Sequence, residues 1–251
     1  MDKEQIDEQR EFLKDSLRLT IDFRFTDQQI GLQPPEIQKP IQPQQSIIKL
    51  PPHTNRESLR ETSLYTAIHK RRSHRRFSAE PINLIELSFL LWATQGMREE
   101  LAPGTALRTV PSAGCRHPFE TYLLITNVTE LKPGVYRYLP REHALVLERT
   151  DADLVEKLPP ATLGQMFTAA AAVTFVWTCI PYRTEWRYHA AAHRVILMDV
   201  GHVCQNLYLA CAAVGGGTCA IAAFHQELMD ELVGVDGKDE FVIYLAPVGK
   251  I

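Results

Sequence analysis

The chain has 251 residues, a formal charge of −3 from 27 basic and 30 acidic residues, and 45% hydrophobic residues. This composition is ordinary for a globular protein of one to two domains. The nearly balanced charge argues against a dedicated nucleic-acid binder, which would present a basic surface. The longest apolar stretch, residues 193–214, contains Asp199, His202 and Asn206, and these polar residues argue against a membrane span.

The cysteines and short motifs exclude several further classes. Five cysteines, an odd number with no C-x-x-C pair, predict reduced thiols in a cytoplasmic protein. The charged N-terminus has no apolar run, so no signal peptide is expected. His189 and His193 are spaced as H-x-x-x-H, but Ala190 replaces the glutamate of zinc proteases, and no metal site is expected. G-x-G-x-x-G, P-loop and G-x-S-x-G signatures are absent.

Residues 1–60 differ in composition from the rest of the chain. Residues 2–18 are charged with periodic apolar positions, which predicts a surface helix. The prolines that crowd residues 33–52 then forbid regular helix and predict an extended arm. The sequence allows either a floppy arm or one packed on the body. The chain therefore divides into an N-terminal helix with a proline-rich arm, 1–60, and a globular domain, 61–251.

From residue 61 onward, periodic patterns and turn signals predict a mixture of helices and strands. Ser63 and Asn83 are suitable N-caps, and Gly96 ends the helix that follows Asn83. The expected helices cover 63–73, 83–96, 193–214 and 226–233, and the expected strands cover 119–126, 134–138, 144–148, 171–179 and 240–248. Because these elements do not alternate as β-α-β units, the predicted fold class is α+β.

The dominant element is the helix expected over 193–214. Apolar residues form two stripes along it, one through Ile196 and Val203 and the other through Leu197 and Cys204. A helix that is apolar on two sides is expected to be buried nearly all round, in a core or in a subunit interface.

The most distinctive feature is the basic run Arg71-Arg72-Ser73-His74-Arg75-Arg76. Guanidinium groups bind phosphate through paired hydrogen bonds. In an extended segment Arg71, Ser73 and Arg75 alternate onto one side, which could follow a long ligand with a phosphate at one end. A solvated charge run is the other interpretation that the sequence allows.

Three further segments accompany the basic run. They are Pro111-Ser112-Ala113-Gly114, the glycine-rich turn 215–217 that leads into Ala222-Ala223, and Gly249-Lys250. In this order, over roughly residues 34–250, they resemble the FMN-dependent nitroreductase superfamily, and more closely its SagB-type dehydrogenases, which are related to thiazoline and oxazoline oxidases. The resemblance implies a nitroreductase fold, in which helices flank a central, mostly antiparallel sheet, and an intertwined homodimer.

The resemblance assigns cofactor-binding roles to the basic residues. Arg71 matches the family arginine on the FMN phosphate, and Ser73 matches the residue near the ribityl chain. Arg75 matches the basic residue beside flavin N1 and O2, where a fixed cation stabilises the negative charge that two-electron reduction places there. Arg72 is counted with this cluster. Lys250 resembles the C-terminal basic residue on the phosphate.

Two loops complete the implied cofactor site. The segment Pro111, Ser112, Ala113 and Gly114 resembles the family loop that a partner subunit contributes to the flavin site. Ala222 and Ala223 fall where the family offers backbone N–H groups to flavin N5 and O4, so small side chains suffice. Cys115 replaces an asparagine of ordinary nitroreductases and Ala222 replaces an acidic residue. Both departures fit the dehydrogenase branch better.

The candidate catalytic residues are Arg187 and Tyr188. In azoline oxidases a Lys-Tyr pair close to the flavin is implicated in proton abstraction, and Arg187-Tyr188 occupies the matching stretch. An arginine is not deprotonated in proteins, so Arg187 is a poor general base. Tyr188 is a candidate proton relay, with a packing role as the alternative.

These observations predict an oxidoreductase that binds FMN at a homodimer interface and transfers hydride to or from a small-molecule or peptide-derived substrate, with NAD(P)H as a candidate electron donor. The alternatives within the enzyme class are a reductase of quinones or nitro compounds, an azoline-type peptide dehydrogenase and a flavin-consuming enzyme. The alternative outside the enzyme class is a flavin-fold binding or scaffold subunit without turnover, and the departures at Arg187 and Ala222 favour it. No nucleic-acid or membrane partner is expected.

Overall fold

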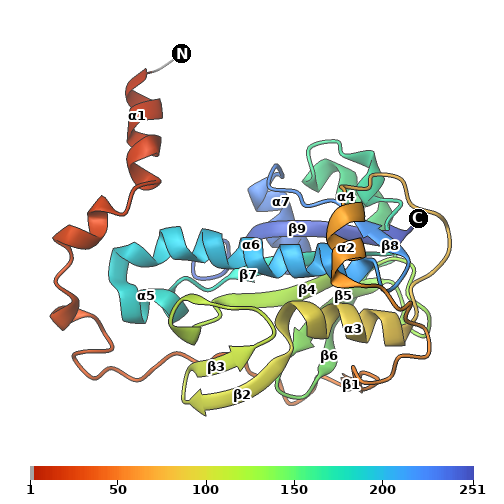
Figure 1. The fold of residues 1–251 in the computed structure, drawn as a ribbon, viewed down its shortest axis with the longest axis horizontal. Helices are drawn as coiled ribbons and strands as arrows, with labels where there is room; N and C mark the ends of the chain where they lie inside the picture. The colour runs from red at the N-terminus through yellow and green to blue at the C-terminus, as the bar shows by residue number, and fades with distance from the viewer. Residues whose placement is uncertain (1–2) are drawn as a thin grey trace.

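A seven-stranded sheet with helices on both faces forms the body of the computed structural model, which describes residues 3–251 (Figure 1). The strand order is β1-β6-β5-β4-β7-β9-β8, and every neighbouring pair is antiparallel. The strands are β1 (Ile47–Lys49), β4 (Phe119–Ile125), β5 (Gly134–Leu139), β6 (Ala144–Thr150), β7 (Val173–Cys179), β8 (Gly216–Thr218) and β9 (Phe241–Lys250). A separate hairpin consists of β2 (Met97–Ala102) and β3 (Thr105–Arg108).

The α-helices lie around this sheet and at the N-terminus. They are α1 (Lys3–Phe12), α2 (Leu64–Lys70), α3 (Leu84–Gln95), α4 (Leu154–Ala161), α5 (Tyr182–Tyr188), α6 (Ala192–Cys211) and α7 (Gln226–Val233). Short 3-10 helices are η1 (Ser16–Thr20), η2 (Phe23–Phe25), η3 (Ala113–Cys115), η4 (Met166–Thr168) and η5 (His189–Ala191). The expected α+β class with a mostly antiparallel sheet is confirmed. No described helix is both long enough and apolar enough to cross a membrane.

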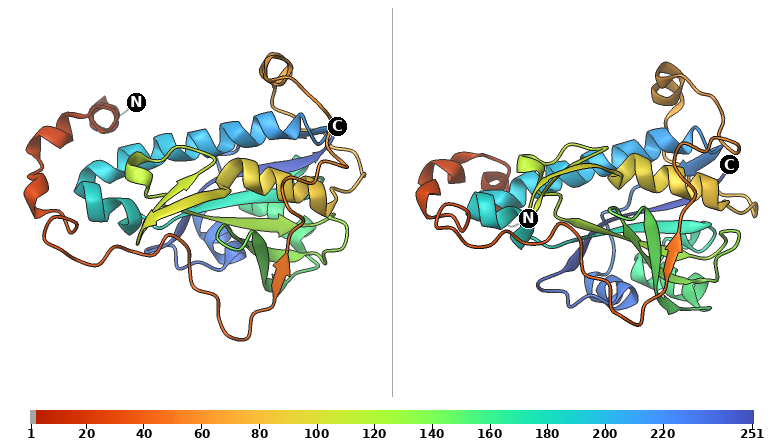
Figure 2. Two further views of the ribbon diagram at one scale, coloured as in Figure 1. Left: turned by 60° about the horizontal axis from the view of Figure 1, so that its bottom comes forward. Right: turned by 90° about the horizontal axis from the view of Figure 1, so that it is seen from below.

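The sheet lies between two layers of helices (Figure 2), and a cluster of buried hydrophobic side chains packs on each face. Helices α3 and α6 cover one face, and α4 and α7 cover the other. Successive side chains of a strand point to opposite faces, so Leu123 of β4 packs beneath α3 and α6 while Leu124 packs against the α4 and α7 layer. Both faces of the central strands are therefore buried.

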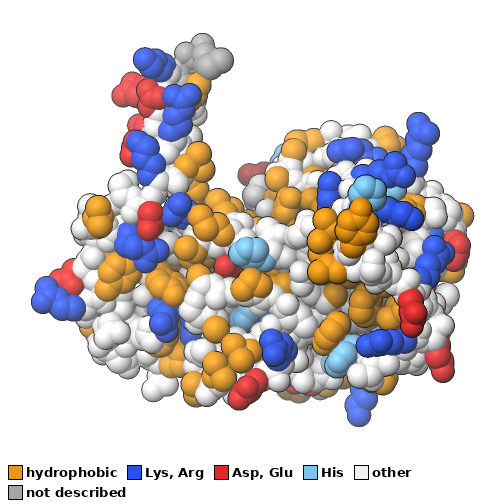
Figure 3. All heavy atoms as spheres, viewed as in Figure 1, with side chains coloured by type: hydrophobic (Ala, Val, Ile, Leu, Met, Phe, Trp, Pro, Cys, Tyr) orange, Lys and Arg blue, Asp and Glu red, His pale blue; other side chains and the backbone are white. Residues whose placement is uncertain are grey.

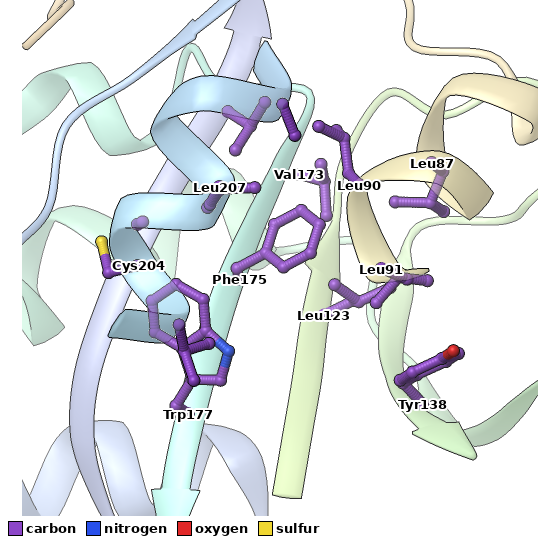
Figure 4. Packing of buried hydrophobic residues seen from close by; sticks show 14 of the residues in the cluster. Leu87, Leu90, Leu91, Leu123, Tyr138, Val173, Phe175, Trp177, Cys204 and Leu207 are labelled. Carbon is purple, nitrogen blue, oxygen red and sulfur yellow. The ribbon is translucent and has the colours of Figure 1, made fainter. Parts of the chain in front are cut away.

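The core between α3, α6 and the sheet fixes the position of the long helix. Leu90 of α3, Leu207 of α6 and Phe175 of β7 gather there, and each is fully buried (Figure 4). Burial of one such side chain contributes roughly 1.5–3 kcal/mol relative to its exposure. This packing holds α6 rigidly across the sheet.

Local signals in the sequence account for most of these elements. Asn83 caps α3 with a complete capping box, in which it accepts a hydrogen bond from Glu86 N–H and Glu86 bonds back to Asn83 N–H. Ser63 caps α2, as expected, but the helix ends at Lys70 rather than at residue 73 because Arg71 has extended ψ of 127°. The expected helices near 83–96, 193–214 and 226–233 and all five expected strands are confirmed within a few residues.

Other elements differ from the expectation. The N-terminal helix predicted over 2–18 ends at Phe12 and is followed by η1, and residue 2 lies outside the described residues. The hairpin of β2 and β3, together with α4 and α5, was not predicted. Helix α6 is not buried all round, because Leu197, Met198 and other residues on one side are exposed in the single chain.

The proline-rich arm packs on the body. Ile37 C=O accepts a hydrogen bond from the buried Arg108 at 2.8 Å. Lys39 N–H donates to Glu120 at 2.8 Å, and its ammonium donates to Glu240 at 2.5 Å. Further along, β1 pairs with the edge of β6. Of the two alternatives that the sequence allowed, the structure therefore shows the packed arm.

Candidate cofactor site

The basic run lies along the glycine-rich strand β8. After α2 ends, Ser73 forms a parallel bridge with Thr218, and His74 N–H donates to Thr218 C=O at 2.9 Å. The side chains of Arg71, Arg72, Ser73 and Arg75 are exposed. The structure thus brings together two of the segments that the sequence singled out.

A hollow of about 360 Å³ opens between α2, the C-terminal end of α6 and β8. Its charged lining residues are the cations Arg60, Lys70, Arg71 and Arg72 and one carboxylate, Glu61, which gives a net charge of +3. Its floor is Gly215–Gly217, and a Cβ at Gly215 would collide with the guanidinium of Arg60. In the space-filling view, Lys and Arg side chains gather over this part of α2 (Figure 3). A concentration of cations over bare backbone suits a phosphate group.

His74 borders the same hollow. Burial, and then the nearby positive charge of Arg72, lower the pKa of His74 below its usual value. The imidazole is therefore predominantly neutral at neutral pH and adds no charge to the site.

Tyr208 of α6 connects three parts of this site, a role that the sequence pattern did not indicate. Its hydroxyl is 2.9 Å from Ser73 Oγ and accepts a hydrogen bond from Ala220 N–H, also at 2.9 Å. The guanidinium of Arg71 lies 5.3 Å from the centre of the Tyr208 ring, within cation–π range. One side chain therefore holds the basic run against the loop that leads to Ala222.

Ala222 and Ala223 lie at the end of that loop and are exposed. The preceding residue, Ile221, exchanges two backbone hydrogen bonds with Leu245 of β9, at 2.8 and 3.2 Å. Gln165 donates to the carbonyl of Ala223 at 2.9 Å. These bonds fix the loop, while the small side chains leave its backbone accessible.

Lys250 and Arg75 occupy different surroundings. The buried ammonium of Lys250 pairs with Glu86 and donates to Val214 C=O at 2.8 Å. Lys250 therefore links the end of β9 to the start of α3, and its charge is already matched by a carboxylate. Arg75 is exposed, and its guanidinium lies 5.9 Å from the centre of the Phe167 ring.

The loop formed by Pro111, Ser112, Ala113 and Gly114 lies near the other end of α6. Asp199 accepts hydrogen bonds from Ser112 Oγ at 2.7 Å and from Ala113 N–H at 3.0 Å. Burial raises the pKa of Asp199, and the bond from Ser112 partly opposes that rise. Gly114 has φ of 61°, and a Cβ there would lie 2.7 Å from the Tyr188 hydroxyl and 2.9 Å from Arg187 Nε. The loop thus packs on both candidate catalytic residues.

Helix α5, which carries Arg187 and Tyr188, is held by buried arginines. Arg116 donates to Arg183 C=O at 2.7 Å and lies 4.6 Å from the centre of the Trp186 ring. Arg183 in turn pairs with Glu120 at 2.5 Å. Because Tyr188 is partly buried on a fixed helix, its hydroxyl can present a proton at a defined position.

The two groups of site residues lie apart in a single chain. Asp199, which holds the 111–114 loop, and Tyr208, which holds the basic run, are separated by nine residues of one helix, or about 13 Å along its axis. Within residues 3–251, no three His, Cys, Asp or Glu side chains gather in a way that could hold a metal ion.

Comparison with known proteins places this geometry in a family. Residues 68–250 match the nitroreductase family model. The chain is 34% identical over 192 residues to MJ1384 of Methanocaldococcus jannaschii, a nitroreductase by name, across 76% of this chain and 93% of that one. The chain belongs to the nitroreductase family.

Two other proteins are similar. A structure from Ralstonia eutropha JMP134, also a nitroreductase by name, has a TM-score of 0.66 and 26% identity, over 87% of this chain and 94% of that one. The trifolitoxin-processing protein TfxB of Rhizobium leguminosarum bv. trifolii is 32% identical over 119 residues, which are 45% of this chain and about a third (32%) of TfxB. The family supports flavin-dependent oxidoreduction, for which FMN is the typical cofactor.

Proposed function

We propose that this protein is an FMN-dependent oxidoreductase whose two cofactor sites form between the subunits of a homodimer. The observation that carries the proposal is the hollow at α2 and β8, where Arg71 and Arg60 surround glycine backbone. Tyr208, which also lines the hollow, connects it to the loop that leads to the exposed Ala222. Arg71 and Ser73 would hold the phosphate and ribityl chain, and Arg75 would lie near the pyrimidine ring. Lys250 would reach the phosphate only in competition with Glu86.

The separation of the two groups along α6 supports a dimer. Asp199 holds the 111–114 loop near one end of the helix, and Tyr208 holds the basic run near the other. If two copies pack with their α6 helices antiparallel, the loop of each chain faces the basic run of the other. The exposed side of α6, which includes Leu197, Met198 and Gly201, would form the contact.

The residues of α5 define what the chain does in the reaction. When bound, FMN supplies the two-electron transfer. Arg187 remains a cation and can orient an anionic group, while Tyr188 can hold or pass a proton at its hydroxyl. Both residues would stand over the cofactor of the opposite subunit, because Gly114 packs directly on them.

The substrate class is proposed from two lines of support. The likeness to TfxB, which is named as a toxin-processing protein, agrees with the SagB-type features of the sequence and favours a peptide-derived substrate. Arg187 in place of the lysine of azoline oxidases favours a different proton acceptor in such a reaction. A small-molecule substrate reduced with NAD(P)H is the second candidate, which the match to MJ1384 supports.

The purified protein is expected to be yellow and to release FMN on heating. Arg71→Ala should weaken FMN binding roughly 10- to 100-fold, because a hydrogen bond to a charged group contributes about 1.5–3 kcal/mol. Titration of the apoprotein by flavin fluorescence measures this change. Arg76→Ala is the matched control, since Arg76 is exposed in the same basic run but does not line the hollow. A protein that takes up no FMN at micromolar concentration would refute the proposed function.

Tyr208→Phe is expected to reduce FMN affinity by a few-fold to about 10-fold, because it removes the hydroxyl that orients Ser73 and Ala220 while it keeps the ring beneath Arg71. Tyr136→Phe, which removes a hydroxyl bonded to Lys132 C=O, is the control and should leave affinity unchanged. Equal affinities in wild type and Tyr208→Phe would show that the hydroxyl does not organise the site.

Turnover separates an enzyme from a scaffold subunit. Reduction of the bound flavin by NADH, NADPH or dithionite is followed at the flavin absorbance band, and reoxidation is then tested with quinone, nitroaromatic and azoline-peptide acceptors. Flavin that is reduced but never reoxidised by any of these acceptors would favour the scaffold.

A further inference from the structure

The N-terminal segment, residues 3–32, carries apolar side chains that its own chain leaves exposed. None of the described residues of α1 is buried. The exposed fractions of Phe12, Leu13, Leu17 and Leu19 are 43%, 68%, 48% and 89%. In Figure 1 this helix stands away from the body. A ten-residue helix is marginal in water without packing, so the segment is built to be covered by another surface.

The segment is attached beside the N-terminal end of α6. Asp15 pairs with Arg194 at 3.3 Å. Trp186 of α5 donates to Leu32 C=O at 3.0 Å and accepts from Gln28 N–H at 2.9 Å. These contacts fix where residues 3–15 leave the body.

A groove of about 1370 Å³ lies toward the other end of α6, between α2, α3 and α6. Phe89, Trp92 and Leu209 contribute apolar surface to it. Beside the groove, the outer side of α2 exposes Leu64 and Tyr65 by 66% and 75%. Figure 3 shows apolar side chains gathered over this helix. The groove and α2 together form a partly apolar surface of the kind on which a helix can pack.

The charges of the two surfaces are complementary. Helix α1 has four acidic and two basic residues, a net charge of −2. The groove is lined by Arg56, Arg60 and Arg98 against Glu61, a net charge of +2. An acidic helix followed by exposed apolar residues, as in 3–19, is therefore the kind of partner that this groove fits.

The positions along α6 indicate which copy of the segment fills the groove. Arg194, at the attachment, and Leu209, in the groove, are fifteen residues or about 22 Å apart along the helix. Helix α1 lies at the opposite end of α6 from its own α2 (Figure 1). In the antiparallel α6 pairing of the proposed dimer, the attachment point of one chain lies beside the groove of the other. We propose that the outer part of this segment, residues 3–20 of each subunit, packs on α2 and its groove in the partner, an inference that rests on the proposed dimer.

Amide hydrogen exchange measured on the full chain tests whether the N-terminal segment packs on the partner. Backbone amides of residues 3–20 should be protected at protein concentrations well above the dimer dissociation constant, and should lose protection on dilution below it. The double variant Leu13→Asp, Leu17→Asp should weaken dimerisation at least 10-fold by sedimentation. Leu163→Asp, at a leucine that is 60% exposed after α4, is the matched control and should leave dimerisation unchanged.

Leu64→Asp on α2 makes the reciprocal change. It should also weaken the dimer. When it is combined with the double variant, the loss of dimerisation free energy should be smaller than the sum of the two separate losses, because both changes act on one contact. A dimer whose N-terminal amides are unprotected, or are protected equally at all protein concentrations, would refute the packing of this segment on the partner. It would leave the proposed dimer itself intact. A wild-type chain that stays monomeric at protein concentrations on the order of 100 micromolar would instead contradict the proposed dimer itself.

Discussion

Gly201→Glu is expected to convert the protein into a monomer that no longer retains FMN. Gly201 lies on the exposed side of α6, and a Cβ added there meets no atom within 4 Å in its own chain. Loss of a helical glycine also removes a local cost of roughly 0.5–1 kcal/mol, so the single chain should fold normally. In the proposed dimer this position faces the partner, where burial of an unpaired charge is very unfavourable.

The expected size of the effect is at least a 100-fold increase in the dimer dissociation constant, about 2.8 kcal/mol. Analytical ultracentrifugation measures the association state, and gel filtration with absorbance detection measures retained flavin. Val155→Glu on α4 is the matched control, because Val155 is also exposed and apolar but lies on the opposite face of the sheet. If the Gly201→Glu protein remains dimeric and yellow, the exposed side of α6 does not form the interface.

The parts of the fold that could be predicted from the sequence are those set by neighbours along the chain. Asn83 and Glu86 form a capping box within three residues, and Gly96 ends the helix that they begin. The two strands of the β5–β6 hairpin are also close in sequence. In each case the residues that specify the element lie inside it or beside it, so the local pattern was sufficient.

The candidate site depends on contacts that no local pattern contains. Ser73 and Tyr208 are 135 positions apart, and Lys250 and Glu86 are 164 apart. The sequence could suggest that Lys250 serves a phosphate, but it could not show that a buried carboxylate already pairs with it. The same holds for Asp199, whose polar character was evident while its bonds to Ser112 were not.

The two apolar stripes of α6 show a further limit. Periodicity indicated that both sides would be covered, but it could not say whether by the same chain or by another. The structure settles this for the single chain, because Ile196 of the first stripe and Cys204 of the second lie in the core while Leu197 and Met198 are exposed. An exposed side of the helix beside a site that is split between its two ends is the physical reason to propose a dimer.

Glu120→Ala is expected to lower the free energy of unfolding by about 3–5 kcal/mol, the usual cost of removing one partner from a buried ion pair. The Glu120 side chain is 2% exposed, and it accepts hydrogen bonds from Arg183 at 2.5 Å and from Lys39 N–H at 2.8 Å. Arg137 lies 3.8 Å away and is equally buried. Without the carboxylate, Arg183 loses its counter-charge, and Glu148 is the carboxylate that still pairs with Arg137.

The same substitution should also loosen the candidate active site. Arg183 is in the first turn of α5, which carries Tyr188, and Lys39 belongs to the packed arm. Urea denaturation followed by far-ultraviolet circular dichroism gives the change in stability, provided that the denaturant slope stays constant. Glu100→Ala is the matched control, because its pair with Arg141 is about one-third exposed and should contribute no more than about 1 kcal/mol. If Glu120→Ala were no more destabilising than this surface control, the buried pair could not be what secures α5 and the arm.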